Sequence, residues 1–489
     1  MTVKTALASI RKKGLRKYLG DYRRNAKEKR RLEKARPEIE AKLKGFIDLA
    51  ISASNLKEEK SNSEIFDMIK PMAEYISLNY KDIKKVSSDK MEILFEKMKS
   101  LEEDREYNNF IKAHYIKDTY PKIYSELSDR PVTNKVIVME SGHAPSPSSK
   151  LLAKEIKKQG VYEVVYMGLL IRTVPNVVFY ENGVRMIKEL ATAKAMFLST
   201  ANELLSHFDI RKETKIIQLW HGVGAFKHVG HSTVNNKHFG KNRKQWEEYD
   251  SYRNYYAVTT AAEGQQWIFE ESMHLKPEQI KAIGISRTDV FFDDEYKENA
   301  LKNLHDRFPQ IKGKKIILYA PTFRGVVGKA KAPDRLDVRA LAENLSSEYV
   351  LLIKHHGLSK DVPPIPEELK DNFAFDLNTD NVLNIDELLA VSDILITDYS
   401  SVAFEFAITE RPILFFVYDL EDYIEQRGLY FDFEKEAPGP LCRTTEDIVR
   451  YISDIDNMFD IEKLLAFKQT YVEACDGHST ERTIALIEE

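Results

Sequence analysis

Apolar residues recur at helical spacing along the first part of the chain, from about residue 24 to 127. Segments such as FDMIKPMAEYISL and MEILFEKMKSL place large apolar side chains three or four positions apart, and glycine is almost absent. This periodicity predicts amphipathic helices. No group of residues suited to catalysis occurs there. We therefore expect residues 1–130 to form a helical region that serves packing, oligomerisation or membrane approach.

The pattern changes at NKVIVMESGH, where Val136–Met139 form a short β-branched run that ends in small and polar residues. Further apolar runs (YEVVYMG, AKAMFLST, KIIQLW) alternate with helical stretches, and a second series begins at KKIILYAPTFRG and culminates in DILITDYSSVAFEF. Alternation of this kind predicts an α/β fold with two doubly wound, Rossmann-like lobes, which we place at residues 131–290 and 291–489. Ligands of such sheets bind outside the carboxyl ends of the strands, so the site is expected in a cleft between the lobes.

Composition narrows the setting of the protein. The chain has 489 residues and is 43% hydrophobic, which is enough for ordinary buried cores. Its two cysteines, Cys442 and Cys475, form no CxxC pair, so we expect a reducing, cytoplasmic environment. The amino terminus is charged and has no apolar signal segment, and no run reaches the roughly 18 to 20 apolar residues that span a bilayer. The expectation is a chain that neither is exported by that route nor crosses a membrane.

Charge is distributed unevenly along the chain. The net charge is −4, yet residues 1–45 hold sixteen Lys or Arg against five Asp or Glu. Such a stretch either binds anionic lipid headgroups or is a solvated helix face, and the sequence favours neither strongly. Nucleic acid is the less favoured partner, because aromatic residues are sparse and no nucleic-acid module follows. A homo-oligomer is left open.

Several strand ends carry groups that suit phosphate chemistry. His221 directly follows the predicted strand KIIQLW, which places it at the cleft as a proton-transfer candidate. In ILITDYSSVAFEF, Ser400 is a natural N-cap, and the helix amides with the hydroxyls of Ser400 and Ser401 would accept a phosphate. Asp398 would orient this turn or meet the ligand. A plain N-cap after a strand is the simpler alternative for these serines.

Two further strand ends in the second lobe supply positive charge. Arg324 follows the strand in APTFRG, and Lys354, His355 and His356 follow the strand in LLIKHH. Each alone could be a surface residue, but together they would stabilise a diphosphate leaving group as its charge builds. The DxD spacing at Asp454–Asp456 lies away from any strand end, so we interpret it as structural and expect no metal site.

Six motifs in order carry a resemblance to a known family: LWHGVGAFKHVG, GISRTDVFF, LYAPTFRG, LIKHH, SDILITDYSSVAFEFAITERPILFF and RGLYFDFEKEAPGPL. Over roughly residues 132 to 450 the chain resembles the CDP-glycerol glycerophosphotransferases, which include the teichoic acid primases and the glycerol- and ribitol-phosphate polymerases. The resemblance implies a GT-B type fold that uses no metal or other cofactor and transfers an alditol phosphate from a CDP donor to an acceptor hydroxyl.

The resemblance also implies roles for single residues. His221 resembles the general base, and Lys354 and His356 match a basic-x-His motif that contacts the donor's pyrophosphate. His355, between them, is the weaker candidate. Further matches around the phosphates are Arg324, Asp398, Ser400, Ser401 and Arg411. For Asp398 and for Glu405 a structural role is at least equally favoured.

The loop after the histidine departs from the family pattern. Many members read WHGTPLKKLG, whereas this chain has Val223, Gly224, Ala225 and Phe226 after WHG. The resemblance implies that Gly222, Val223, Gly224 and Phe226 border the acceptor site. Glycerol and ribitol donors, CDP-glycerol and CDP-ribitol, are therefore both open, as is the choice between priming and polymerising.

The expected function is transfer of glycerol phosphate or ribitol phosphate to a lipid-linked teichoic acid or capsule polymer, with release of CMP. The enzyme would be cytoplasmic and peripheral on the inner face of the cell membrane, where its aqueous donor and tethered acceptor meet. Two alternatives are a GT-B glycosyltransferase that uses a nucleotide sugar and a non-catalytic nucleotide-binding scaffold.

Overall fold

The computed structural model describes residues 15–56, 59–102, 105–140, 146–168, 176–220, 222–234, 236, 241–325, 330–359, 361–378, 383–430 and 432–489. The chain divides into two compact units. One comprises Met1–Asp129 and Leu170–Ala191, and the other comprises Arg130–Leu169 and Thr192–Glu489.

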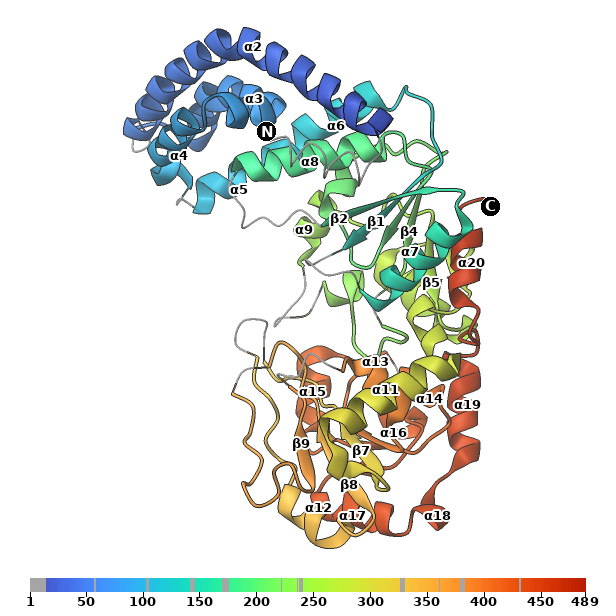
Figure 1. The fold of residues 1–489 in the computed structure, drawn as a ribbon. Helices are drawn as coiled ribbons and strands as arrows, with labels where there is room; N and C mark the ends of the chain where they lie inside the picture. The colour runs from blue at the N-terminus through green and yellow to red at the C-terminus, as the bar shows by residue number, and fades with distance from the viewer. Residues whose placement is uncertain are drawn as a thin grey trace. The chain divides into compact units, whose positions relative to one another are not determined.

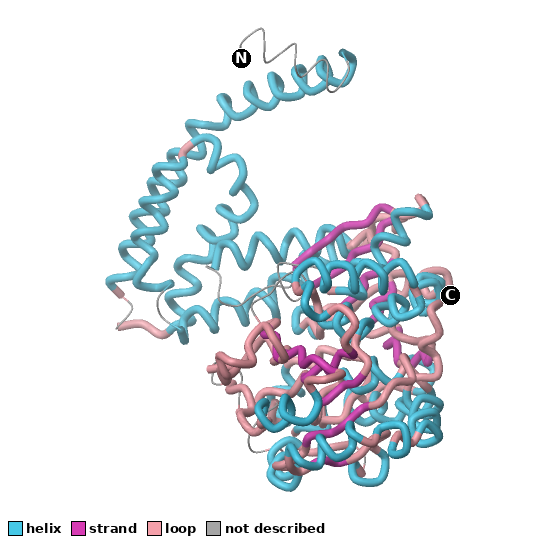
Figure 2. The backbone as a smooth tube through the Cα atoms, turned by 60° about the horizontal axis from the view of Figure 1, so that its bottom comes forward, coloured by secondary structure: helices cyan, strands magenta, loops and turns pink. Residues whose placement is uncertain are grey.

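The first unit is built from helices, and no strand occurs among its described residues (Figure 2). Its elements are α2 (Leu15–Asn55), α3 (Asn62–Val86), α4 (Ser88–Glu102), α5 (Arg105–His114), the π-helical turn η1 (Tyr115–Thr119), α6 (Tyr120–Leu127) and α8 (Asn176–Leu190). Amphipathic periodicity explains them, because one face of each helix buries residues such as Leu43, Ile76 and Leu94. The predicted helical amino-terminal region is thus confirmed.

Helix α8 is held to this unit by aromatic packing. The Tyr180 ring lies 4.9 Å from the Tyr115 ring, centre to centre, and the Tyr120 hydroxyl donates a hydrogen bond to the Phe179 carbonyl at 2.9 Å. A Cβ at Gly183 would lie 2.2 Å from the Tyr120 ring, so the close approach of the two helices requires glycine there.

The first lobe of the second unit contains a six-stranded parallel sheet with the order β2-β1-β3-β4-β5-β6. Figure 1 labels β1, β2, β4 and β5 of this sheet. Its strands are β1 (Lys135–Glu140), β2 (Glu163–Gly168), β3 (Ala195–Leu198), β4 (Lys215–Gln218), β5 (Ala257–Thr260) and β6 (Ile280–Ala282). The helices and 3₁₀ turns between them are α7 (Pro147–Gln159), η2 (Glu203–His207), η3 (Gly230–Thr233), α9 (Arg243–Glu248), η4 (Glu263–Gln265), α10 (Gln266–Met273), η5 (Pro277–Gln279) and η6 (Ser286–Phe292).

The second lobe contains another six-stranded parallel sheet, in the order β12-β11-β10-β7-β8-β9. Its strands are β7 (Lys315–Tyr319), β8 (Tyr349–Ile353), β9 (Ala374–Asp376), β10 (Ile394–Thr397), β11 (Ile413–Phe416) and β12 (Leu441–Cys442). The accompanying helices are α11 (Asp294–Arg307), η7 (Pro309–Ile311), α12 (Val338–Leu345), α13 (Ile385–Val391), α14 (Val402–Ala407), α15 (Leu420–Arg427), α16 (Phe433–Glu436), α17 (Thr445–Ser453), α18 (Ile455–Met458), α19 (Ile461–Tyr471) and α20 (Ser479–Ala485).

Strands that are buried on both faces explain these sheets. All residues of β3, β5, β8, β10 and β11 are buried, which is the pattern of a parallel sheet covered by helices on either side. Two doubly wound sheets and a helical region confirm the predicted α/β, GT-B type fold class.

The domain ranges expected from the sequence stay a prediction. Two segments, however, pack against a different part of the molecule from the one in which those ranges place them. Helix α8, between β2 and β3, belongs to the helical unit. Helix α20 lies beside α7 (Figure 1), and Ile484, Leu486 and Ile487 join the first lobe's apolar core. The carboxyl-terminal helix therefore completes the first lobe rather than the second.

Candidate active site

The strand order of the second lobe reverses between β7 and β10, and doubly wound sheets bind ligands at the carboxyl ends of such a pair. Asp398 follows β10 and is only 2% exposed. Its Oδ1 accepts hydrogen bonds from the backbone N–H of Thr322, which follows β7, at 2.8 Å and from that of Tyr399 at 2.7 Å. Asp398 therefore ties the two strand ends of the switch point together.

Arg324 is held by two carboxylates beside this turn. Its Nη1 donates to Asp398 Oδ2 at 2.8 Å and to the Thr322 carbonyl at 2.8 Å, while Nε and Nη2 pair with Asp419 at 2.6 and 3.0 Å. Burial opposes the charge, but Asp398 and Asp419 raise the pKa of the guanidinium. Arg324 thus braces the Asp398 turn, and its predicted contact with a phosphate stays a prediction.

The two serines lie at the start of α14, as the sequence predicts. Ser401 is the residue before the helix, and its side chain caps no backbone N–H. The Ser400 Oγ accepts a long hydrogen bond from the Val402 N–H at 3.5 Å. A Cβ at Gly222 would lie 3.3 Å from the Ser401 Oγ. The Ser401 hydroxyl therefore faces the segment that follows His221 in the sequence.

The three residues after β8 have different surroundings. Lys354 Nζ donates a hydrogen bond to the Leu377 carbonyl. His355 is buried, which lowers the pKa of its imidazole, and its backbone N–H donates to Asn378 Oδ1 at 2.6 Å. His356 is exposed, with its ring centre 5.0 Å from that of Phe323. Its accessible imidazole makes His356 the member best placed to meet a ligand.

Arg411 is not brought together with these residues. It precedes β11, so it lies at the amino-terminal edge of the parallel sheet, opposite the switch point. Its guanidinium donates hydrogen bonds to the carbonyls of Ser392 and, at 3.1 Å, Ala390, at the end of α13. Through these hydrogen bonds Arg411 caps the carboxyl end of α13. The structure gives no support for its expected place around the phosphates.

The segment Gly222–Gly230 leaves the first lobe and packs into the second, and we call it the inserted loop. Val223 and Phe226 are each 2% exposed and belong to an apolar core made largely by the second lobe. The Phe226 ring lies 4.5 Å from that of Phe404 and 5.0 Å from that of Phe433. A Cβ at Gly224 would lie 2.5 Å from the Phe404 ring.

These contacts hold the inserted loop of the first lobe in the apolar core of the second lobe. The roles of Gly222, Val223, Gly224 and Phe226 at an acceptor site stay a prediction. Their burial shows that the residues in which this loop departs from the family pattern fill a core.

His221, the predicted general base, lies outside the described residues. The residue before it, Trp220, adopts a left-handed backbone conformation with φ 57°, which is unusual for a bulky side chain. Its backbone N–H is held by Gln218 Oε1 at 2.9 Å, and its ring packs on Phe269. Strain of this kind, of the order of 1 to 3 kcal/mol, often occurs at functional sites.

Sequence reasoning missed two residues that the structure places at this junction. Arg287 pairs with Asp386, and its Nη1 lies 3.5 Å from Glu405 Oε1, so one guanidinium of the first lobe meets two carboxylates of the second. Lys227 extends from the inserted loop to the Tyr423 ring, which stacks on Tyr399 beside Asp398. The motif GISRTDVFF contained Arg287, but nothing in its spacing indicated a partner.

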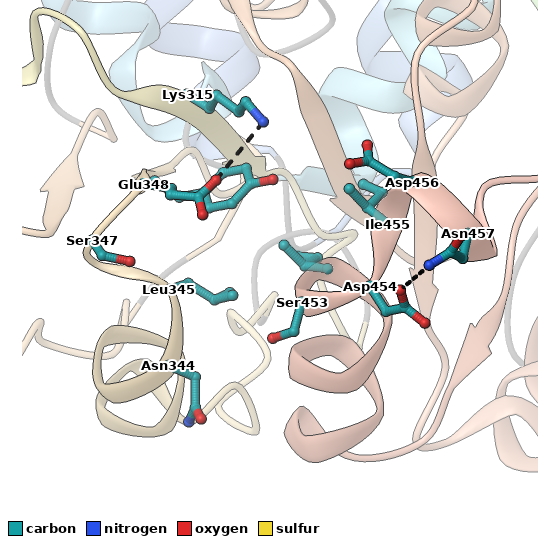
Figure 3. A pocket seen from close by; sticks show the side chains of 12 residues that line it. Lys315, Asn344, Leu345, Ser347, Glu348, Ser453, Asp454, Ile455, Asp456 and Asn457 are labelled. Atoms are coloured by element: carbon teal, nitrogen blue, oxygen red, sulfur yellow. Dashed lines mark hydrogen bonds and ion pairs between the residues drawn. The ribbon is translucent and has the colours of Figure 1, made fainter.

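The cavity of about 290 Å³ drawn in Figure 3 lies away from the switch point. Its lining includes Lys315 at the start of β7 and Glu348 just before β8, so it opens at the amino ends of the strands. Asp454 and Asp456 line it as well, and the Asp454 Oδ1 accepts a hydrogen bond from Asn457 Nδ2 at 2.6 Å. This geometry agrees with a structural role for the DxD spacing.

No cluster of three or more His, Cys, Asp or Glu side chains with the geometry to hold a metal ion occurs in the part of the chain that the structure describes. None of the helices within the same ranges combines the length and the apolar character needed to cross a bilayer. Independence of the reaction from metal stays a prediction.

Residues 122–489 match the family model described as CDP-Glycerol:Poly(glycerophosphate) glycerophosphotransferase. The teichoic acid poly(ribitol-phosphate) polymerase of Bacillus spizizenii is 35% identical over 305 residues, which cover 62% of this chain and 48% of that protein. The teichoic acid ribitol-phosphate primase of the same organism is 37% identical over 303 residues, which cover 61% and 75%. The teichoic acid glycerol-phosphate primase of Bacillus subtilis is 34% identical over 325 residues, which cover 64% and 80%. The chain thus spans about half the length of the first relative and three quarters or more of the two primases.

Solved structures show the same fold. The wall teichoic acid polymerase TagF superposes with a TM-score of 0.62 at 22% identity, covering 79% of this chain and 98% of that one. A variant of that polymerase soaked with CDPG gives a TM-score of 0.62 and covers 78% and 96%.

Proposed function

Because the chain belongs to the CDP-glycerol:poly(glycerophosphate) glycerophosphotransferase family, we propose that it transfers glycerol phosphate or ribitol phosphate from a CDP-alditol to a polymer hydroxyl. The acceptor is a lipid-linked teichoic acid or capsule polymer, and CMP is released. One observation of the structure carries the proposal. The Asp398 turn, with Ser400 and Ser401, lies at the switch point of the second sheet, and Ser401 faces the loop that follows His221.

The proposed reaction is a displacement at phosphorus. The acceptor oxygen forms a bond to the phosphorus that carries the alditol, and the bond from that phosphorus to the bridging oxygen breaks. CMP leaves with the bridging oxygen and its electron pair, and the hydroxyl proton passes to the imidazole of His221. A well-placed general base typically contributes about 10²- to 10⁴-fold to such a rate.

On the donor side, Lys354, His356, Ser400 and Ser401 supply the charge and hydrogen bonds that the leaving group requires. Arg324 contributes indirectly, because it holds Asp398 and hence the two strand ends in place. Since protein cations supply this charge, we expect turnover to continue when divalent cations are removed with EDTA.

The acceptor is proposed to reach the enzyme at a membrane surface. The basic residues 1–45 would attract the protein to anionic lipid on the cytoplasmic face, where a lipid-linked polymer is tethered. An enzyme that is peripheral in this way combines a donor from water with an acceptor from the membrane.

A donor panel tests the proposal. The full chain is incubated with CDP-glycerol, CDP-ribitol or nucleotide sugars in the presence of a lipid-linked acceptor, and the released nucleotide is measured. We expect CMP from at least one CDP-alditol. Nucleoside diphosphate from a nucleotide sugar alone would identify a glycosyltransferase, and no release from any donor would favour a non-catalytic scaffold.

Two variants separate the proposed roles. His221→Ala should lower kcat by about 10²- to 10⁴-fold with little change in donor binding, because a general base acts on the acceptor proton. His356→Ala should mainly weaken donor use and raise KM for the CDP-alditol. Near-normal turnover by His221→Ala would exclude His221 as the base.

A further inference from the structure

Lys227 is a cation that the first lobe delivers to the switch point of the second. The inserted loop fixes its backbone, because residues 227 and 429 form an antiparallel bridge. On either side, the Tyr430 N–H donates to the Phe226 carbonyl at 2.9 Å and the His228 N–H donates to the Gly428 carbonyl at 3.2 Å. A main chain held on both sides fixes the point from which the Lys227 side chain extends.

The Lys227 ammonium lies beside a tyrosine ring and near charged groups of both signs. Its Nζ lies 5.8 Å from the centre of the Tyr423 ring, which stacks on Tyr399 at 3.9 Å. Burial lowers its pKa to about 8, the negative charge of Asp398 acts in the opposite direction, and the positive charges of Arg427 and Arg324 lower it further. Among the described residues, Lys227 makes no hydrogen bond or ion pair.

Asp398, the one carboxylate among these charged neighbours, is already engaged. It accepts hydrogen bonds from Arg324 and from the backbone N–H groups of Thr322 and Tyr399. Desolvation lowers the pKa of His356, and the positive charge of Lys227 lowers it further. Two groups that gain positive charge on protonation therefore approach each other from two lobes, and neither has a carboxylate partner in the described ranges.

A buried or half-buried cation without a partner is unfavourable unless an anion joins it. Resting on the function proposed above, we propose that Lys227 binds a phosphate of the donor's diphosphate, together with His356. The inserted loop thus places one phosphate-binding cation of the first lobe at the nucleotide site of the second. The ligand of Lys227 is a nucleoside diphosphate, and its role is to stabilise the negative charge that develops on the departing CMP.

Binding of CDP, which carries the diphosphate without the alditol, tests this directly. Isothermal titration of the full chain with CDP at pH 7 should show that Lys227→Met loses about 10- to 100-fold in affinity, the usual weight of a charged hydrogen bond. Lys227→Arg, which keeps the charge, should retain most of the affinity. The methionine variant should fold at least as well as the wild type, because it removes a partly buried charge without changing volume much.

Proton uptake distinguishes a phosphate contact from a packing role. At pH 9 much of the Lys227 population is neutral in the free protein, and a bound phosphate would raise the pKa of the amine and draw in a proton. Titrations in two buffers of different ionisation enthalpy should show this uptake for the wild type. Neither Lys227→Met nor Lys227→Arg should show it, since methionine does not titrate and arginine stays charged.

The outcomes separate this inference from the proposed function. Equal CDP affinity of the wild type and Lys227→Met, with no proton uptake at pH 9, would overturn the role of Lys227 even if CMP is released from a CDP-alditol. Proton-linked CDP binding without transfer from any CDP-alditol would support Lys227 and overturn the proposed reaction. A wild type that does not bind CDP would overturn both.

Discussion

Glu405 is a buried carboxylate that connects the inserted loop to α14. Its side chain is 1% exposed, it accepts a hydrogen bond from the Val223 N–H, and Arg287 lies 3.5 Å away. Burial raises its pKa from 4.5 to about 7, because the attraction of Arg287 does not compensate fully for lost hydration and Asp386 adds repulsion. Glu405 therefore holds the segment that follows His221 in the sequence, and the free energy lost by burying its carboxylate depends on pH.

The variant Glu405→Gln tests this cost. Between pH 4.5 and about 7 the folded wild type holds a proton that the unfolded chain releases, so its free energy of unfolding should fall as the pH rises through this window. The neutral variant lacks this dependence. Its free energy of unfolding relative to that of the wild type should therefore rise by up to roughly 3 kcal/mol across the window. Urea unfolding at several pH values measures the difference. The exposed Glu425→Gln is the control, and a constant difference for Glu405→Gln across the window would refute the argument.

The inserted loop packs into the second lobe because its small residues leave room for its large ones. Gly224 lies against the Phe404 ring, and this close approach lets Phe226 enter the core of the second lobe. The same segment begins directly after His221 and carries Lys227. Packing of Phe226 therefore fixes the main chain from which Lys227 extends.

Gly224→Ala should disturb this element. The added Cβ would lie 2.5 Å from the Phe404 ring, which is itself buried and has little room to move. We expect a loss of about 1 to 3 kcal/mol in unfolding free energy. Displacement of the loop should also lower turnover by about 10- to 100-fold, since small misplacements of reacting groups are costly.

Denaturant unfolding and CMP release, measured on the same preparations, check both effects of Gly224→Ala. Gly168→Ala is the matched control, because no atom lies within 4 Å of a Cβ at that position. If Gly224→Ala unfolds and turns over like this control, the loop is not held by the contact with Phe404.

The elements themselves were predictable, whereas their partners often were not. Short β-branched runs such as Val136–Met139 indicate strands because burial on both faces requires them. Helix α8 has the amphipathic pattern of any crossover helix, and its spacing does not reveal that its apolar face packs in the helical unit. The run VGAF is too short to predict a strand, and only the fold shows that it fills the core of the other lobe.

The same limit applies to the predicted site residues. Asp398, Ser400 and Ser401 follow β10 as expected, because strand ends are readable from a sequence. Arg411 stands before β11, and the amino edge of a parallel sheet is distinguished from its carboxyl edge only when the strand bounds are known. The partners that occupy Arg324 come from separate parts of the chain, Asp398 and Asp419, so no local motif reveals them.

For the molecule as a whole, the excess positive charge of residues 1–45 is partly used within the helical unit. Arg31 pairs with Asp82 at 2.6 Å, and Arg36 donates to the Val86 carbonyl at 2.8 Å. Lys27, Arg30 and Lys34 are exposed on α2 at positions that share one helix face, and they make no ion pair with any other described residue. Among the described residues, this face is one part of the basic stretch that could meet the membrane proposed above.

A triple variant of this face, Lys27→Gln with Arg30→Gln and Lys34→Gln, should weaken binding to vesicles that contain anionic lipid. Each basic residue near such a surface contributes about 1 kcal/mol, so the loss should be on the order of 100-fold at low salt. Sedimentation with anionic and with neutral vesicles measures it. The matched control replaces Lys150, Lys154 and Lys157, which are exposed on α7, by glutamine and removes the same charge from the first lobe. Equal losses in both triple variants would mean that net charge alone attracts the protein, and no loss in either would leave the basic stretch as a solvated helix face.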